Sequence, residues 1–147
     1  ALKRDLLVRA TVVTPNLSEA EALTGMTVRD IDDMRRAAEM LVTLGVKVAV
    51  VKGGHLDSET ICDLVATEDG AYTLASPRIE TRHTHGTGCT LASAIATGLA
   101  QGMEMRSAIE RARRYLIAAL ESAPGYGQGH GPLDHAHTVS LDEWGAG

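Results

Sequence analysis

Hydrophobic positions fall into short β-branched runs and longer segments with helical spacing. Residues 11–14 (Thr-Val-Val-Thr) and 46–51 (Val-Lys-Val-Ala-Val-Val) are rich in β-branched residues, and each run predicts a buried strand. Pro15 stops the first run, and Lys52 leads out of the second into two glycines. The two runs therefore predict strands whose carboxyl ends are followed at once by turn residues.

A pair of apolar segments later in the chain predicts a β-hairpin. Residues 60–66 and 71–75 flank Glu68-Asp69-Gly70, a sequence typical of a tight turn between antiparallel strands. Residues 78–82 fit either a short strand or a loop.

Apolar residues spaced three and four apart predict four helices, at residues 18–23, 30–44, 88–100 and 105–120. Ser18, with Glu21 three residues later, is the candidate N-cap of the first helix, and Gly25 is its candidate stop. The helix at 88–100 consists almost purely of apolar and small residues, which predicts that it is buried.

This order of elements predicts an α/β fold with a mainly parallel sheet flanked by helices. No linker divides the chain, so we expect residues 1–147 to belong to one domain, with 124–147 as a Gly-rich tail. Residues 1–10 already show helical spacing without a cap. We therefore expect the chain to be part of a longer protein.

Composition and charge exclude several classes of function. The 147 residues carry 14 Lys plus Arg and 19 Asp plus Glu, a formal charge of −5, which argues against a nucleic-acid partner. No apolar run reaches about 18 residues, so we expect no membrane partner. Cys62 and Cys89 are too few for a disulfide framework, and two free thiols favour a cytoplasmic location.

The strongest candidate site precedes the apolar helix, at residues 84–90, Thr-His-Gly-Thr-Gly-Cys-Thr. Gly86 and Gly88 let a ligand approach the backbone closely. Free N–H groups at a helix N-terminus, together with the helix dipole, favour a bound anion. The alternative is a glycine-containing turn that merely begins a helix, but two glycines around Thr87 favour phosphate binding.

Two more candidates follow the predicted strands. Lys52 stands at a strand end, where ligands of open parallel sheets bind, and its charge suits a phosphate; the alternative is a solvated lysine. Asn16 and Glu19 lie three residues apart after the other strand and offer the hard oxygen ligands that suit a hydrated Mg²⁺. The alternative for this pair is local helix capping by Asn16.

Two pairs of histidines raise the question of zinc. His83 and His85, and likewise His135 and His137, are separated by one residue. No third or fourth ligand stands at a recognised spacing, so the sequence predicts no zinc site.

Four segments resemble, in the same order, the signatures of bacterial hydroxymethylpyrimidine/phosphomethylpyrimidine kinases, which are thiamine-biosynthetic enzymes of the ribokinase-like superfamily. These segments are residues 13–25, 51–55, 84–90 and 129–135. Each is weak alone, but together they are specific and extend over the chain from about Leu6 to His137. The resemblance implies that only the C-terminal half of such an enzyme is present. The resemblance therefore implies that residues 1–147 are the C-terminal portion of one ribokinase-like α/β domain.

The resemblance also implies roles for the candidate residues, with ATP and Mg²⁺ as cofactors. Lys52 matches the lysine that contacts the transferring phosphate, and Asn16 and Glu19 match the element that organises Mg²⁺ and phosphates. The residues that match the family's anion hole are Gly86, Thr87, Gly88 and Cys89. One departure is His83, which stands where the family usually has Asn.

Cys89 matches the position at which most ribokinase-like relatives have an Asp base, and the pyrimidine kinases a Cys. A thiol at the start of a helix can act as a thiolate and accept the proton of the substrate alcohol. Lys52 and Cys89 are thus the expected catalytic pair. The alternative for Cys89 is a small, buried packing residue.

The implied activity is ATP-dependent transfer of phosphate to hydroxymethylpyrimidine and to its monophosphate, by a homodimer. A pyridoxal or pyridoxine kinase of the same superfamily is the alternative, because vitamin B6 alcohols are also hydroxymethyl heteroaromatics. An alternative of another class is a non-catalytic fragment that binds nucleotide or packs against a partner.

Overall fold

The computed structural model describes residue 5 and residues 7–54, 59–79, 86–123 and 131–138. The chain forms two compact units, Ala1–Arg78 and Ile79–Gly147. Among the described residues, no helix is long and apolar enough to cross a membrane.

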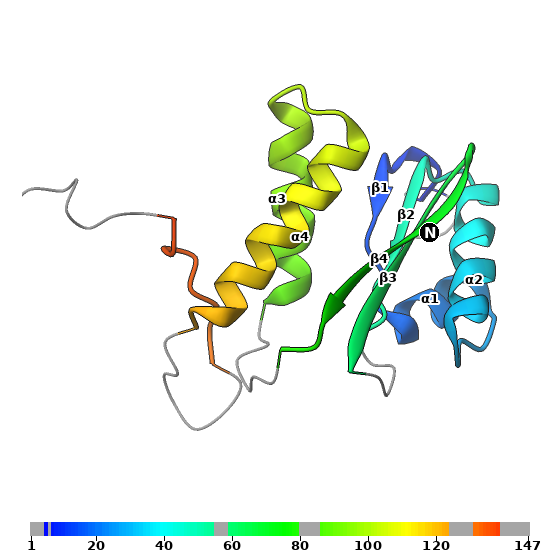
Figure 1. Cartoon of the computed structure of the whole chain (residues 1–147). Helices are drawn as coiled ribbons and strands as arrows, with labels where there is room; N and C mark the ends of the chain where they lie inside the picture. Colours follow the sequence, from blue (N-terminus) through cyan, green and yellow to red (C-terminus); the bar gives the residue numbers. More distant parts are fainter. Residues whose placement is uncertain (1–4, 6, 55–58, 80–85, 124–130, 139–147) are drawn as a thin grey trace, which may run out of the picture. The chain divides into compact units, whose positions relative to one another are not determined.

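In the first unit, the described residues form a sheet in the order β1-β2-β3-β4 (Figure 1). The strands are β1 (Val12–Val13), β2 (Val48–Val51), β3 (Thr60–Thr67) and β4 (Gly70–Pro77). A 3-10 helix precedes them at Leu7–Arg9, and α1 (Leu17–Thr24) and α2 (Ile31–Thr43) connect β1 to β2. The predicted α/β class and the predicted hairpin are confirmed.

The prediction of a mainly parallel sheet is wrong for this part of the chain. β1 and β2 pair in parallel, but β2–β3 and β3–β4 both pair antiparallel, so the sheet is mixed. The physical reason is the length of the connections. A parallel pair needs a crossover of a dozen or more residues, which α1 and α2 provide between β1 and β2, whereas residues 52–59 are too few to provide one.

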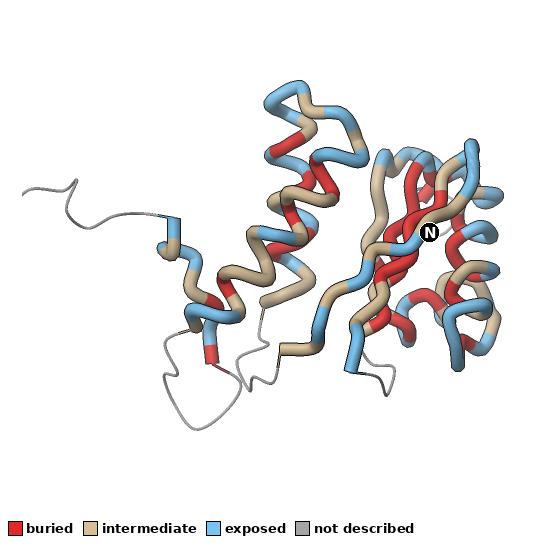
Figure 2. Tube along the Cα trace, viewed as in Figure 1, coloured by how far each residue is buried: buried red, intermediate tan, exposed pale blue. Residues whose placement is uncertain are grey.

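The core of this unit lies between α2 and one face of the sheet. α2 packs on β2 and β3, and α1 packs on α2. In Figure 2 the side of α2 toward the sheet and the middle of β2 and β3 are buried. Fully buried side chains in this layer are Met34, Ala37, Ala38, Leu41, Ala49, Val51, Leu64 and Ala66.

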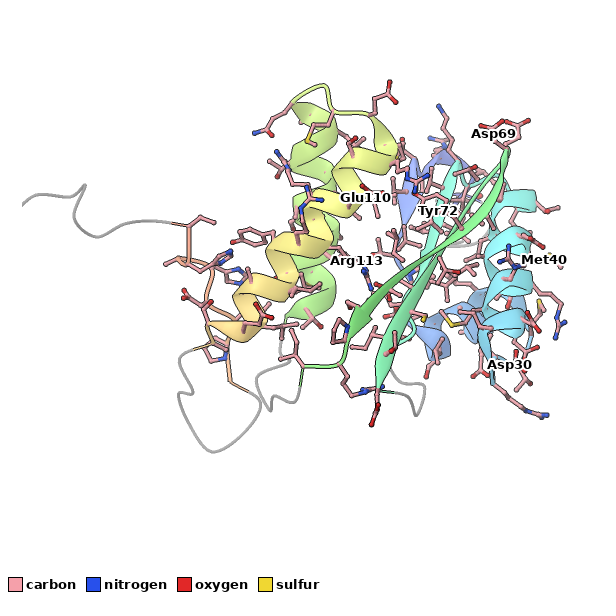
Figure 3. The ribbon with its side chains drawn as sticks, viewed as in Figure 1. Asp30, Met40, Asp69, Tyr72, Glu110 and Arg113 are labelled. Atoms are coloured by element: carbon pink, nitrogen blue, oxygen red, sulfur yellow. The ribbon has the colours of Figure 1, made fainter. Side chains whose placement is uncertain are left out.

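Two carboxylates fix the start of α2. Asp30, labelled in Figure 3, is the N-cap, and its carboxylate accepts a hydrogen bond of 2.8 Å from the backbone N–H of Asp33. Asp33 in turn accepts from the backbone N–H of Arg29 at 3.0 Å and pairs with Arg36. The Arg29 N–H and then the Arg36 guanidinium lower the pKa of Asp33 below its usual value. The helix start predicted at residue 30 is confirmed.

In the second unit, α3 (Thr87–Ala100) and α4 (Met105–Glu121) form a helical hairpin (Figure 1). A Cβ built on Gly98 would lie 2.9 Å from the Ala108 side chain, so the helices approach closely there. The prediction that α3 is buried is confirmed for the side that α4 covers and is wrong for the other side, where Ala92 and Ala96 are exposed. The buried residues of α3 are Thr90, Leu91, Ile95 and Gly98.

The described part of the C-terminal segment, residues 131–138, lies along α4. The backbone N–H of Asp134 donates to the carbonyl of Ala119 at 3.1 Å, and the hydroxyl of Tyr115 donates to the carbonyl of His135 at 3.1 Å. Leu133 is buried. The rest of the tail predicted at 124–147 lies outside the described residues.

Candidate active site

The ends of the two parallel strands bring two of the candidate residues side by side. Asn16 and Lys52 form an isolated parallel bridge just beyond β1 and β2, and the backbone N–H of Lys52 donates to the carbonyl of Pro15 at 2.9 Å. The sequence suggested these residues separately. Because parallel strands end at the same edge of a sheet, the fold places both at the edge where ligands of such sheets bind.

Asn16 and Glu19 form a capping box at the start of α1. The Asn16 side chain accepts from the backbone N–H of Glu19 at 2.8 Å, and Glu19 Oε2 accepts from the backbone N–H of Asn16 at 2.8 Å. The expectation that Ser18 is the cap is therefore wrong, since the helix begins at Leu17 and Ser18 lies inside it. The predicted stop at Gly25 is confirmed, with φ 78°.

The capping interpretation of Asn16 is thus realised, and it is compatible with a metal-binding role. An ionised carboxylate offers about four acceptor sites, and the box uses one oxygen of Glu19, whose residue is exposed. The box fixes the side chains of Asn16 and Glu19 relative to each other, and the backbone of Asn16 pairs with that of Lys52. These hard oxygen donors fit a hydrated Mg²⁺, held largely through water.

The two glycines after Lys52 differ sharply in their surroundings. A Cβ on Gly53 would lie 2.0 Å from the carbonyl oxygen of Cys62 in β3 and 3.1 Å from the end of the Met34 side chain. A Cβ on Gly54 would meet nothing within 4 Å. Gly53 is therefore required for the strand end to pass close to β3, and Gly54 is not.

We expect Gly53→Ala to destabilise the fold strongly and Gly54→Ala to change it little. A Cβ cannot occupy a position 2.0 Å from a backbone carbonyl, so Gly53→Ala forces β2 away from β3 and should cost about 1–3 kcal/mol or more. The free energy of unfolding, measured by urea denaturation of both variants, tests this. Equal stability of the two variants would contradict the close approach of Gly53 to β3.

The N-terminus of α3 has backbone donors without a partner among the described residues. Gly86 is the N-cap in the left-handed conformation, with φ 87°, and no side chain caps the helix. The first intrahelical bond is made by the N–H of Thr90 to the carbonyl of Gly86. The preceding N–H groups of Thr87, Gly88 and Cys89 therefore have no partner within the helix, which is the geometry of an anion-binding helix end. Thr84 and His85 lie outside the described residues.

Cys89 is exposed, and it is not a packing residue in this structure. It lines a groove of about 870 Å³ whose walls come from α3, α4 and residues 135–138, a volume in the range of small-molecule sites. Thr90 and Ser93 of α3 and Arg114 and Tyr115 of α4 also line this groove. The thiol is therefore accessible to a ligand held at the helix end.

The histidines add no metal centre to the described residues. His83 and His85 lie outside them. His137 packs its ring against Tyr115, with centroids 4.7 Å apart, and His135 is exposed. Within the described ranges, no group of three or more His, Cys, Asp or Glu side chains is placed to hold a metal ion.

The sequence reasoning missed Asp63 and Arg78. Asp63 is buried in β3 and accepts a hydrogen bond of 3.1 Å from the backbone N–H of Gly53, and Arg78 donates to the carbonyl of Gly54 at 3.0 Å. Both side chains hold the loop after Lys52. For Asp63 a signal existed, because a carboxylate inside an otherwise apolar strand must find a partner.

A strand-end lysine, a capping box of oxygen donors beside it and an uncapped, glycine-rich helix end are features typical of phosphoryl-transfer enzymes. A model of the phosphomethylpyrimidine kinase family matches residues 1–134. The chain belongs to this family.

Individual relatives agree with this assignment. The chain is 48% identical over 134 residues to the thiamine biosynthesis bifunctional protein ThiED of Geobacter sulfurreducens, covering 91% of this chain and 27% of that protein. It is 44% identical over 135 residues to the hydroxymethylpyrimidine/phosphomethylpyrimidine kinase of Streptomyces coelicolor, covering 92% of this chain and 50% of that protein. The chain thus spans half the length or less of these curated relatives.

The fold resembles that of solved kinases. The pyridoxal kinase of Bacillus subtilis, solved as an ADP complex, superposes with a TM-score of 0.89 at 37% identity, covering 93% of this chain and 54% of that one. The ribokinase-like fold expected from the sequence is therefore confirmed for the part of the fold that this chain contains.

Proposed function

We propose that this chain is the C-terminal, phosphate-handling part of an ATP-dependent hydroxymethylpyrimidine/phosphomethylpyrimidine kinase of thiamine biosynthesis. The observation that carries the proposal is the family match over residues 1–134. The strand-end lysine and the uncapped helix end provide the positive charge and the amides that phosphoryl transfer requires. The proposed partner is a small hydroxymethyl heteroaromatic alcohol, bound by a cytoplasmic homodimer.

Each candidate residue has a step in the proposed reaction. The N–H groups of Thr87, Gly88 and Cys89 hold phosphate oxygens at the helix end. Lys52 neutralises charge that develops on the transferring phosphate. The Cys89 thiolate accepts the proton of the primary alcohol as the alcohol oxygen bonds to the γ-phosphorus of ATP. The bond from that phosphorus to the bridging oxygen breaks, and ADP leaves. Asn16 and Glu19 would hold Mg²⁺ through water, and that ion would neutralise phosphate charge when bound.

A pyridoxal kinase is the second candidate, because the Bacillus subtilis pyridoxal kinase shares this fold closely. Its substrate and hydroxymethylpyrimidine both present a hydroxymethyl group on a heteroaromatic ring. Direct assay of both alcohols distinguishes the two candidates.

The deciding experiment is a kinase assay of the complete protein with ATP and each of three substrates. We expect phosphorylation of hydroxymethylpyrimidine and of its monophosphate, with slower turnover of pyridoxal. Turnover of pyridoxal alone would favour the second candidate. Activity with none of the three, together with unchanged amide resonances of residues 87–89 on addition of ADP, would overturn the kinase proposal.

The proposed role of Glu19 can be separated from its capping role. Gln also completes a capping box, so Glu19→Gln should leave the stability unchanged while it removes the negative charge. We expect the Mg²⁺ concentration for half-maximal activity to rise about tenfold. Ser18→Ala, one residue away on the exposed side of α1, is the matched control. If Glu19→Gln needs no more Mg²⁺ than the wild type, Glu19 only caps α1 and does not bind the metal ion.

A further inference from the structure

Lys52, which the proposed mechanism places at the transferring phosphate, is followed by two residues without side chains. Lys52 is followed by Gly53 and Gly54, and glycine loses more conformational freedom on folding than any other residue. Gly53 is there because β3 leaves no space for a side chain. Because β3 requires a glycine at position 53, the residue next to Lys52 is one whose backbone has few conformational restrictions of its own.

Asp63, on the neighbouring strand β3, holds the backbone of Gly53 in place through a hydrogen bond. Its side chain is buried, the residue being only 7% exposed, and its Oδ1 accepts a hydrogen bond of 3.1 Å from the backbone N–H of Gly53. A buried carboxylate is costly unless it is hydrogen-bonded, and the Gly53 N–H is one of the partners of Asp63. The bond thus fixes the peptide group that immediately follows Lys52.

The strand register places Asp63 directly across from Lys52. β2 and β3 pair antiparallel, with Val51 opposite Leu64. Continued by one residue, this register sets Lys52 opposite Asp63, and residues opposite each other project from the same face of a sheet. Asp63 therefore acts on the backbone of Gly53 from the side of the sheet toward which Lys52 projects.

A second side chain holds the other glycine. Arg78, which follows β4, donates from Nη1 to the carbonyl of Gly54 at 3.0 Å. The two residues after Lys52 are thus held by an acceptor from β3 and a donor from the end of β4. Both hydrogen bonds lie within the first unit and link the β3–β4 hairpin to the residues that follow β2.

We propose that Asp63 is a positioning residue for Lys52, acting through its hydrogen bond to Gly53, with Arg78 supporting the same loop. The inference rests on the proposed kinase function, since it concerns the lysine assigned there to the transferring phosphate. Its specific content is that the acceptor atom of Asp63 is needed, and its negative charge is not.

The test compares Asp63→Asn with Asp63→Ala in the complete kinase. Asn keeps an Oδ1 acceptor for the Gly53 N–H, so kcat should stay within about threefold of the wild type. Ala removes the acceptor and lets Lys52 move, so kcat should fall about tenfold to a hundredfold while KM for the alcohol changes little. Asp69→Ala, an exposed residue at the turn of the same hairpin (Figure 3), is the control and should leave both parameters unchanged.

A second readout does not depend on activity. Hydrogen exchange of the Gly53 amide, followed by NMR, should be slow in the wild type and in Asp63→Asn and fast in Asp63→Ala. If Asp63→Ala does not fold, Arg78→Met provides the variant. It removes the donor to Gly54 and keeps the aliphatic stem, and it should lower kcat in the same direction by a smaller factor.

The two proposals fail in different ways. An inactive wild type would overturn the kinase function. An active wild type whose Asp63→Ala and Arg78→Met variants keep full kcat would overturn the positioning role alone. Equal losses in Asp63→Asn and Asp63→Ala, with Gly53 exchange slow in both, would also overturn it, because the acceptor atom would not be what matters.

Discussion

Replacing Lys52 by alanine in the complete kinase is expected to lower kcat by about 10²–10³-fold, the typical loss when one preorganised electrostatic group is removed from a reaction centre. Lys52 is half-buried at the end of β2, and its backbone is fixed by the hydrogen bond to Pro15 and by the bridge to Asn16. Alanine keeps both backbone interactions. The loss should therefore appear in turnover and not in folding.

Lys47 provides a matched control for this variant. It precedes β2, whereas Lys52 follows it, and Lys47 is exposed. Lys47→Ala should change neither kcat nor the melting temperature, because an exposed charge contributes little to stability. Steady-state kinetics and thermal unfolding of both variants make the comparison. Unchanged turnover in Lys52→Ala would show that Lys52 is only a solvated strand-end residue.

The elements themselves could be predicted because local signals set their ends. Asp30 caps α2 as its position before an apolar-periodic segment predicts, and the turn at Glu68-Asp69 joins two strands as the hairpin signal predicts. The cap of α1 was misplaced because Ser18 and Glu21 fit the same spacing rule as Asn16 and Glu19. Sequence spacing alone does not decide between two overlapping capping boxes, whereas the end of β1 does.

The antiparallel pairing of β2 with β3 could have been inferred from the short connection between these two strands. The burial of α3 could not, because it depends on what packs against the helix. An apolar, small-residue composition permits a buried helix, but here α4 covers one side, and Ala92 and Ala96 are exposed. The composition of a helix thus shows whether the helix can be buried, but not which of its sides another element covers.

The identities of the candidate site residues could be predicted from the motifs, but their environment could not. The bridge of Asn16 to Lys52 depends on the register of two strands that are far apart in sequence. The hydrogen bond from Gly53 to Asp63 depends on the register of β2 with β3. Neither register follows from the residues next to it in the sequence. The role of Asp63 was therefore missed, although a carboxylate in an apolar strand is a signal for a buried polar partner.

The two cysteines differ in burial and in their position in the fold. Cys62 lies in β3 and is half-buried, while Cys89 is exposed in the first turn of α3. A helix N-terminus stabilises a thiolate, which is the reactive form. A limiting thiol reagent at neutral pH should therefore modify Cys89 first, and ATP should protect it.

Cys89→Ser should lower phosphoryl transfer in the complete kinase by about 10²–10⁴-fold, the usual effect of losing a general base. The swap is nearly isosteric at an exposed position, so the melting temperature should not change. Cys62→Ser is the matched control, and its turnover should equal that of the wild type. Single-turnover measurement of the chemical step compares the three proteins.

Cys89→Asp is the sharper variant, because it offers a base without a thiol at the same helix end. The exposed position accepts a carboxylate without a buried charge, and the N-terminal dipole of α3 favours its ionised form. We therefore expect Cys89→Asp to recover part of the rate that Cys89→Ser loses. If Cys62 reacts first and Cys89→Ser keeps full activity, the thiol takes no part in proton transfer, and the amides at the start of α3 act with Lys52 alone.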